Sequence, residues 1–197
     1  MPITVQQRPF YRGPVAMVQQ LLSTHLRPGD RVVDATCGNG KDTLFLARLI
    51  APHGELHAFD IQPEAIERTE ALLTQHQLLD GVTCYVASHE NMASYVKAPC
   101  QAIVFNLGWL PGGDHTITTC SDSTIRALLV ARDLLAPGGL LMITCYPGHP
   151  GGEQEALAVN TACAAFDPRY FFVWKLSQSN VAPNAPYTIA IQRSPTP

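Results

Sequence analysis

Segments typical of β-strands alternate along this chain with segments typical of helices. The predicted strands span residues 31–35, 55–60, 82–87, 102–107, 140–145, 170–176 and 187–192, and the predicted helices span residues 42–51, 63–79, 125–135 and 153–165. This alternation predicts an α/β fold in which helices cover both faces of a mostly parallel sheet. The last two strands have no helix between them, so we expect an antiparallel C-terminal hairpin. The cluster Pro137-Gly138-Gly139 is expected to end the helix that precedes the fifth strand.

Length and composition favour a single domain. With 197 residues and 46% hydrophobic content, the chain can bury one sizeable core, which we expect over residues 30–193. The chain has 13 Lys+Arg against 16 Asp+Glu, so it lacks a strongly basic nucleic-acid-binding footprint. Residues 1–29 are expected to form an N-terminal arm or helix. They hold Arg8, Arg12 and Arg27 but no Asp or Glu, and form either a solvated leader or an arm that contacts phosphates.

The six cysteines indicate a reducing compartment. They form no C-x-x-C pair, and no cluster of His and Cys has the spacing of zinc ligands, so we expect free thiols and no metal site. No N-terminal segment has the pattern of a secretory signal, and no apolar run is long enough to span a bilayer. The sequence therefore predicts a cytoplasmic protein without a membrane partner.

The segment Asp34-Ala-Thr-Cys-Gly-Asn-Gly-Lys-Asp42 lies where the first predicted strand leads into a helix. In such sheets, ligands bind beyond the carboxyl ends of the strands. Gly38 and Gly40 allow a tight turn and a close approach of a ligand, and the first amides of the helix point to the same place. Thr43 stands where a dinucleotide site needs Gly or Ala, and no Gly-Lys-Ser/Thr ends the segment as in a P-loop.

Acidic residues around this turn indicate the class of ligand. Asp34 and Asp42 flank the turn, which disfavours a pyrophosphate and favours a ligand with positive charge. Asp60 ends the second predicted strand and can accept hydrogen bonds from both hydroxyls of a ribose. A ligand with a ribose, a cationic end and no phosphate is S-adenosylmethionine. Gln62 follows and either contacts the ribose or adenine or caps the next helix.

The segment from Asp34 to Gly40 resembles the first motif of class I S-adenosylmethionine-dependent methyltransferases, with Thr36 where a glycine is more usual. More narrowly, the chain resembles bacterial proteins described as rRNA methylases, through the motifs D-A-T-C-G-N-G-K-D-T-L-F-L-A, F-D-I-Q, S-H-E-N, F-N-L-G-W-L-P-G-G-D and Y-P-G-H-P-G-G-E. The resemblance covers residues 26–192. Members of this family are similar to the enzyme that methylates the aminomethyl group of 5-aminomethyl-2-thiouridine at the tRNA wobble position.

The resemblance implies a Rossmann-like class I methyltransferase fold with seven strands, S-adenosylmethionine as cofactor and the anticodon loop of tRNA as partner. The residues expected to bind the cofactor are Asp34, Cys37, Gly38, Asn39, Gly40, Asp42, Thr43, Asp60, Gln62, Ser88 and His89. His89 follows the third predicted strand, where the adenine ring would lie, and only the resemblance assigns it this role.

The later motifs fit an amine as the methyl acceptor. Asn106 ends the fourth predicted strand, where amine-directed methyltransferases carry Asn or Asp. Its side-chain carbonyl can accept a hydrogen bond from an amino group and so aim the lone pair of the nitrogen. Leu107-Gly108 replaces the Pro-Pro that is usual in such enzymes. Trp109 either stacks on a base of the substrate or packs against its neighbours.

Two further segments are candidates for the substrate wall. The loop of residues 111–115 either closes over the substrate or is a plain surface loop, and a glycine-rich turn after the fifth strand carries Tyr146 and His149. A primary alkylamine is largely protonated near neutral pH, so one group must accept its proton. The candidates for this role are His149, Asp114, His115 and Tyr146. We assign Asn106, Tyr146 and His149 as catalytic residues, and Trp109, Gly112, Asp114 and His115 as substrate-binding residues.

The sequence leaves other functions open. A methyltransferase that acts on rRNA or on a small-molecule amine would share these features. A nicotinamide-dependent dehydrogenase is disfavoured by Thr43 and by the two flanking carboxylates, and a cofactor-binding module would not need the motifs after the fourth and fifth strands. A uridine C5-methyltransferase needs a nucleophilic cysteine, and none lies in a recognisable catalytic setting. A second subunit could widen the surface that binds an anticodon loop, so a homodimer is also considered.

Overall fold

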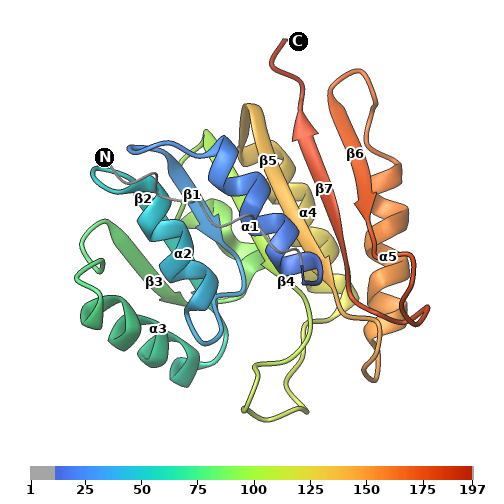
Figure 1. Cartoon of the computed structure of the whole chain (residues 1–197), viewed down its shortest axis with the longest axis horizontal. Helices are drawn as coiled ribbons and strands as arrows, with labels where there is room; N and C mark the ends of the chain where they lie inside the picture. The colour runs from blue at the N-terminus through green and yellow to red at the C-terminus, as the bar shows by residue number, and fades with distance from the viewer. Residues whose placement is uncertain (1–11, 197) are drawn as a thin grey trace, which may run out of the picture.

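Seven strands form one mixed sheet at the centre of the computed structural model, which describes residues 12–196 (Figure 1). The strands are β1 (Arg31–Asp34), β2 (Glu55–Asp60), β3 (Val82–Val86), β4 (Cys100–Asn106), β5 (Leu135–Cys145), β6 (Phe171–Leu176) and β7 (Tyr187–Arg193), in the order β3-β2-β1-β4-β5-β7-β6. The first five strands pair in parallel, and β7 is antiparallel to both β5 and β6. The predicted α/β fold with an antiparallel C-terminal hairpin is therefore confirmed, with β6 at the edge of the sheet.

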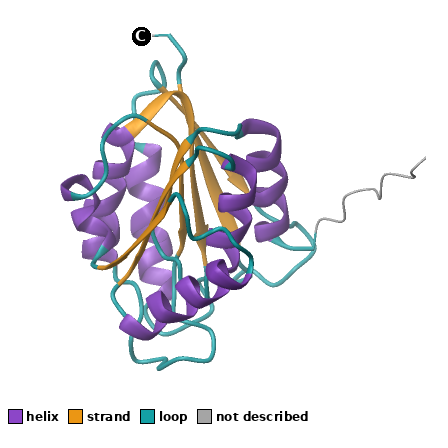
Figure 2. Ribbon diagram, turned by 90° about the vertical axis from the view of Figure 1, so that its left-hand side faces the viewer, coloured by secondary structure: helices purple, strands orange, loops and turns teal. Residues whose placement is uncertain are grey.

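Helices cover both faces of the sheet (Figure 2). They are α1 (Pro14–His25), α2 (Lys41–Ile50), α3 (Pro63–Gln75), α4 (Ser121–Leu134) and α5 (Gly152–Ala164), together with a short 3-10 helix, η1 (His89–Ser94). The first three contribute apolar side chains to the core on one face, and η1, α4 and α5 to the core on the other. Val32 belongs to the first core and Val33 to the second, because successive side chains of a strand point to opposite faces. In the part of the chain described, no helix has the length and apolar character that a membrane crossing requires.

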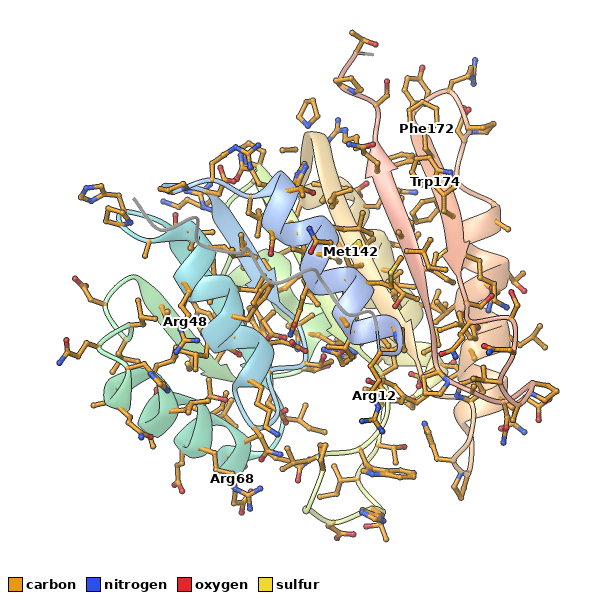
Figure 3. The ribbon with its side chains drawn as sticks, viewed as in Figure 1. Arg12, Arg48, Arg68, Met142, Phe172 and Trp174 are labelled. Carbon is orange, nitrogen blue, oxygen red and sulfur yellow. The ribbon has the colours of Figure 1, made fainter. Side chains whose placement is uncertain are left out.

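The N-terminal helix α1 packs onto the sheet beside β5 and β7. It begins with Pro14, at a position where the missing N–H leaves no hydrogen bond unmade. Val18 and Leu22 are buried in the same core as α2. Arg12 is exposed at the start of the helix (Figure 3), and Arg8 lies outside the described residues.

The cluster Pro137-Gly138-Gly139 lies inside β5, and the expectation that it ends a helix was wrong. Helix α4 ends at Leu134, and β5 begins at once with Leu135, which pairs with Cys100. The register between β4 and β5 shifts after this pair, and the cluster accommodates the irregularity. A Cβ on Gly139 would lie 3.0 Å from the carbonyl oxygen of Cys100, so this close approach favours glycine.

Two other predicted boundaries were wrong by about one helical turn. Helix α3 ends at Gln75 rather than at residue 79, because Gln77 adopts a left-handed conformation with a φ of 57°. Helix α4 begins at Ser121 rather than at residue 125. Its N-cap residue, Cys120, is extended, and the Cys120 carbonyl accepts the N–H of Thr124 at 3.0 Å, which starts the helix earlier.

Candidate active site

A cavity of about 820 Å³ opens at the carboxyl ends of the parallel strands. It lies where the strand order reverses between β1 and β4, the usual ligand-binding crevice of such sheets. Its wall includes twelve of the predicted site residues: Cys37, Gly38, Asn39, Asp42, Asp60, Gln62, Ser88, His89, Asn106, Trp109, Tyr146 and His149. The wall does not include Asp34, Gly40 and Thr43, which are buried, or Gly112, Asp114 and His115, which belong to the loop after β4 (Figure 1).

The turn between β1 and α2 forms one wall of the cavity. Gly38 and Gly40 have φ values of 53° and 77°, which glycine adopts more readily than any other residue. A Cβ on Gly40 would lie 2.8 Å from the Cα of Thr69 in α3, so this position has no room for a side chain. The tight turn brings the N-terminal amides of α2 to the cavity.

Asp60, at the end of β2, is held by two backbone amides. Its Oδ2 accepts the N–H of Gly38 at 3.1 Å, and its Oδ1 accepts the N–H of Gln62 at 2.9 Å. Burial raises the pKa of the Asp60 carboxyl above its usual value. Each oxygen keeps a second lone pair, so the carboxylate can accept further hydrogen bonds from a ligand such as a ribose.

Asp34 is fully buried and supports the turn from within the protein. Its Oδ2 accepts the hydroxyl hydrogen of Thr43 at 2.7 Å, and its Oδ1 accepts the N–H of Thr36 at 3.3 Å. Burial, together with the nearby charge of Asp42, raises the pKa of Asp34 to about 7. The contacts of Asp34 and Thr43 therefore join β1 to α2, and neither side chain lines the cavity.

Asp42 joins three elements at the cavity wall. Its Oδ2 accepts a hydrogen bond from Nδ2 of Asn106 at 2.9 Å, and its Oδ1 accepts one from Nε2 of Gln19 in α1 at 3.0 Å. Because Asp42 engages the amide nitrogen of Asn106, the amide oxygen Oδ1 is the group left to meet a ligand. Sequence reasoning missed Gln19, since a glutamine within a helix carries no local signal of such a role.

His89 lines the cavity at the start of η1. Its Nε2 is buried and has no hydrogen-bond partner among the described residues, and its ring packs edge-to-face on Phe105 with the centroids 5.6 Å apart. Burial lowers the pKa of His89, so the ring is mainly neutral at pH 7. A buried nitrogen of this kind is a polar group that a ligand N–H can satisfy. Beside it, Ser88 donates to Oε1 of Glu90 at 3.3 Å.

Trp109 contacts two histidine rings. It stacks on His115, with centroids 4.6 Å apart and an interplanar angle of 21°, and meets His149 edge-to-face at 4.9 Å. Nδ1 of His149 donates to the carbonyl of Pro150 at 3.0 Å, so in the neutral ring Nε2 carries the lone pair. This Nε2 is buried and without a partner in residues 12–196. Tyr146 lines the same cavity, and burial raises the pKa of its phenol.

Asp114 organises the loop after β4 instead of facing the cavity. Its Oδ1 accepts both the N–H and the hydroxyl hydrogen of Thr116 at 2.8 Å, and these bonds lower the pKa of Asp114. Gly112 is exposed in the same loop. His115 contacts the site through its stack on Trp109.

The wall also includes residues that were not predicted, among them Thr119 and Asn184. The hydroxyl of Thr119 accepts the N–H of Gly108 at 2.8 Å and donates to Oε2 of Glu155 at 2.7 Å. Asn184 belongs to the segment between β6 and β7 and lies near Gly148. Because β7 is antiparallel to β5, it begins at the edge where β5 ends, and the segment before it returns to the cavity. This topology is the signal that could have identified Asn184.

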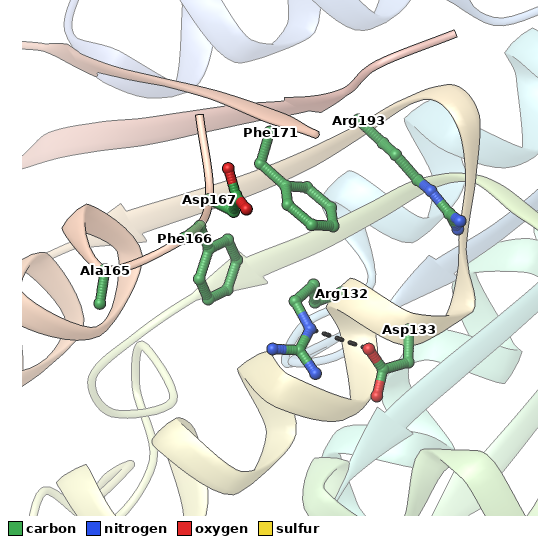
Figure 4. A pocket seen from close by; sticks show the side chains of 7 residues that line it. All are labelled: Arg132, Asp133, Ala165, Phe166, Asp167, Phe171 and Arg193. Atoms are coloured by element: carbon green, nitrogen blue, oxygen red, sulfur yellow. Dashed lines mark hydrogen bonds and ion pairs between the residues drawn. The ribbon is translucent and has the colours of Figure 1, made fainter. Parts of the chain in front are cut away.

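A second cavity, of about 400 Å³, lies near the amino end of β5, between the C-terminal ends of α4 and α5 (Figure 4). Its arginines already have partners. Arg132 pairs with Asp133 at 2.8 Å and lies over the ring of Phe166, and Arg193 donates to the carbonyl of Leu135. The lining of this second cavity comes from the C-terminal end of α4, the segment after α5 and strands β6 and β7. The first cavity lies at the carboxyl ends of the parallel strands and is therefore the candidate active site.

The first cavity fits S-adenosylmethionine. The glycine turn admits a close approach, Asp60 keeps acceptor capacity for ribose hydroxyls, and Nε2 of His89 is a buried acceptor that an adenine N–H would satisfy. Among residues 12–196, no three His, Cys, Asp or Glu side chains are placed to hold a metal ion. The fold and the site together define the class of S-adenosylmethionine-dependent methyltransferases.

Comparisons with known proteins place the chain within this class. The profile of the family described as "Putative rRNA methylase" matches residues 56–192, and the chain belongs to this family. A crystal structure described as a "putative rRNA-methylase" from Clostridium thermocellum is 38% identical and covers 93% of this chain and 99% of its own, with a TM-score of 0.91. A "putative methyltransferase" from Streptococcus mutans, solved in complex with SAH, is 29% identical over 93% of this chain and 99% of its own, with a TM-score of 0.85.

One curated relative is named as a tRNA methyltransferase. The Arabidopsis thaliana protein named tRNA (mnm(5)s(2)U34)-methyltransferase, chloroplastic, is 41% identical over 140 residues. The match covers 66% of this chain and 51% of the relative, so the chain spans about half the length of that protein.

Proposed function

We propose that this protein transfers a methyl group from S-adenosylmethionine to the amine of 5-aminomethyl-2-thiouridine at the tRNA wobble position, giving 5-methylaminomethyl-2-thiouridine. The observation that carries the proposal is the orientation of Asn106. Asp42 holds its Nδ2 at 2.9 Å, which leaves Oδ1 for the acceptor. An oxygen in this place can accept a hydrogen bond from an amine and aim its lone pair. The name of the 41% identical relative supports the same substrate.

Methyl transfer to an amine needs alignment and the loss of a proton. The cofactor, when bound, supplies an electrophilic methyl group on a positively charged sulfur. The neutral amine nitrogen forms a bond to the methyl carbon as the carbon–sulfur bond breaks, and the sulfur keeps that electron pair. Asn106 contributes by holding one amine N–H on its Oδ1, which limits the directions that the nitrogen lone pair can take.

In this proposal, Nε2 of His149 is the proton acceptor. An alkylammonium resembles lysine, with a pKa of about 10, so it must lose a proton before it can attack the methyl group. The bond from Nδ1 to Pro150 places the lone pair of the neutral ring on Nε2, which has no partner among the described residues. Tyr146 is a neighbouring donor, because the raised pKa of its phenol means that it keeps its proton at neutral pH.

Trp109 and His115 form an aromatic platform suited to a nucleobase. An anticodon loop presents unstacked bases, and proteins bind such bases by stacking them on aromatic side chains. Lys41 and Arg126 lie on the cavity wall and can meet the phosphates of the loop, although Arg126 is also paired with Glu90 at 2.5 Å. The homodimer and the cytoplasmic location expected from the sequence stay predictions.

Nucleoside mass spectrometry tests this function. The purified protein and S-adenosylmethionine are incubated with tRNA that lacks the final methyl group, and in parallel with fully modified tRNA as control. We expect a gain of one methyl on 5-aminomethyl-2-thiouridine and no gain on the control. No gain on either tRNA, from a protein shown by calorimetry to bind the cofactor, would overturn the tRNA substrate. A gain on rRNA or a small amine would then assign the acceptor.

A further inference from the structure

Glu155 is a buried carboxylate that takes no part in the chemistry described above. It lies in the first turn of α5, is 3% exposed and does not line the cavity. Its Oε2 accepts the hydroxyl hydrogen of Thr119 and its Oε1 that of Thr124, both at 2.7 Å. A carboxylate is costly to bury unless hydrogen bonds compensate for its lost hydration, and these two bonds supply that compensation.

Thr119 pairs with Gly108 at the two ends of the loop after β4, and this pair of residues is here called the neck of the loop. The hydroxyl of Thr119 accepts the N–H of Gly108 at 2.8 Å, and the N–H of Thr119 donates to the carbonyl of Gly108 at 2.9 Å. A β-bridge between Trp109 and Thr118 follows directly. Residues 109–118, here called the acceptor loop, therefore form a loop whose ends are held together, as in Ω-loops.

The acceptor loop contacts both sides of the active site. On the cofactor side, Nδ2 of Asn39 in the glycine turn donates to the carbonyl of Pro111 at 2.9 Å. On the acceptor side, Trp109 packs on His149. At the neck, a Cβ on Gly108 would lie 3.6 Å from Nε2 of His149, so the backbone there is close to that ring. The position of the neck therefore sets where Trp109 lies relative to His149.

We infer that Glu155 is a positioning residue: through Thr119, it fixes the neck of the acceptor loop and with it the place of Trp109 at the cavity. The bond to Thr124 anchors the same carboxylate to α4, which packs against α5 behind the site. The expected effect of Glu155 on tRNA binding rests on the proposed function, whereas its expected effect on the acceptor loop rests on the hydrogen bonds alone.

Two threonine variants form a matched pair. Thr119→Val removes the hydroxyl that links Gly108 to Glu155. Thr124→Val removes the other hydroxyl bonded to the same carboxylate and leaves the neck intact. Each variant exchanges a hydroxyl for a methyl group and leaves Glu155 with one hydrogen bond. Thr119→Ser keeps the hydroxyl and is expected to restore the loop.

Hydrogen exchange, measured by mass spectrometry on peptides that cover residues 108–119, tests the loop without any substrate. We expect Thr119→Val to speed exchange there about tenfold, because opening of the neck exposes the amides, and Thr124→Val to stay within about twofold of wild type. Thr119→Ser should exchange at the wild-type rate. Equal acceleration in both valine variants would overturn the inference, since it would show that Glu155 only stabilises the fold.

Steady-state kinetics with tRNA test the consequence for the acceptor. We expect Thr119→Val to raise KM for tRNA about tenfold, and Thr124→Val to keep the wild-type KM. An unchanged KM in a Thr119→Val protein with a loosened loop would overturn the link between Glu155 and the acceptor. If wild type does not methylate tRNA, the proposed function fails, and the exchange experiment still decides whether the hydroxyl of Thr119, which joins Gly108 to Glu155, holds the loop.

Discussion

Nδ2 of Asn106 donates a hydrogen bond to Oδ2 of Asp42 at 2.9 Å, and this bond leaves the amide oxygen Oδ1 of Asn106 free for a ligand. Asp42 lies in the first turn of α2, after the glycine turn, and Asn106 ends β4. The bond therefore links the start of α2 to the end of β4, which are the proposed cofactor and acceptor sides of the site. An amide held by its nitrogen presents its oxygen, which is the atom that a hydrogen-bonding amine requires.

Asn106→Ala is expected to lower kcat by roughly 100-fold or more, because the amine loses the acceptor that aligns it. Cofactor affinity should stay within about threefold of wild type, since the glycine turn and Asp60 are unchanged. Single-turnover methylation and calorimetry measure the two quantities. Full activity in this variant would show that another group aligns the amine.

Gln19 supports the same pair of residues from α1. Its Nε2 donates to Oδ1 of Asp42 at 3.0 Å, so Gln19→Glu would place a second carboxylate against Asp42. We expect kcat to fall about tenfold through displacement of Asp42 and Asn106. Gln20→Glu makes the same change at the next residue of α1 and serves as the control. Equal initial rates in the two variants would show that Asp42 does not need Gln19.

The fold could be predicted from the sequence because each element has a local pattern. Apolar runs identified the strands, and the glycine turn and Asp60 identified the cofactor edge of the sheet. Gln19 and Glu155 could not be found in this way, since their partners lie 23 and 36 residues away and neither residue belongs to a motif. Asp34 and Asp42 look equivalent in the sequence, but folding buries Asp34 against Thr43 and places Asp42 on the cavity wall.

Asp34 is expected to make stability depend on pH. Burial raises its pKa from 3.8 to about 7. At pH values between these two pKa values, the folded protein still holds a proton that the unfolded chain has released. The resulting stability is fully present below the unfolded pKa and is lost as the pH rises through about 7. We expect the free energy of unfolding of wild type to fall, relative to Asp34→Asn, by on the order of 4 kcal/mol between about pH 4 and about pH 8. Urea unfolding of both proteins measures this difference, and parallel pH curves would contradict it.

Alanine substitutions at Gly40 and Gly138 allow the cost of backbone strain alone to be compared with the cost of strain together with steric overlap. Both glycines have a positive φ, of 77° and 78°. A Cβ on Gly138 would meet nothing within 4 Å, whereas one on Gly40 would lie 2.8 Å from the Cα of Thr69. We expect Gly138→Ala to cost about 1 kcal/mol and Gly40→Ala about 3 kcal/mol, with weaker cofactor binding only in Gly40→Ala. Denaturant unfolding and calorimetry test this, and equal losses of stability would show that α3 yields to the turn.

Trp109 and Trp174 are the two tryptophans of the chain, and they allow the aromatic platform to be tested against a matched control. Trp109 lines the cavity, whereas Trp174 is 50% exposed on the edge strand β6 (Figure 3). Stacking of one base on an aromatic side chain contributes about 1–3 kcal/mol, so Trp109→Ala should weaken binding of an anticodon stem-loop roughly tenfold or more. Trp174→Ala should bind as wild type does. Fluorescence anisotropy at one fixed salt concentration measures both affinities, because contacts to phosphates make binding depend on salt. Equal affinities would show that Trp109 packs only against His115 and His149, and the acceptor base would then have to be held by other residues of the cavity.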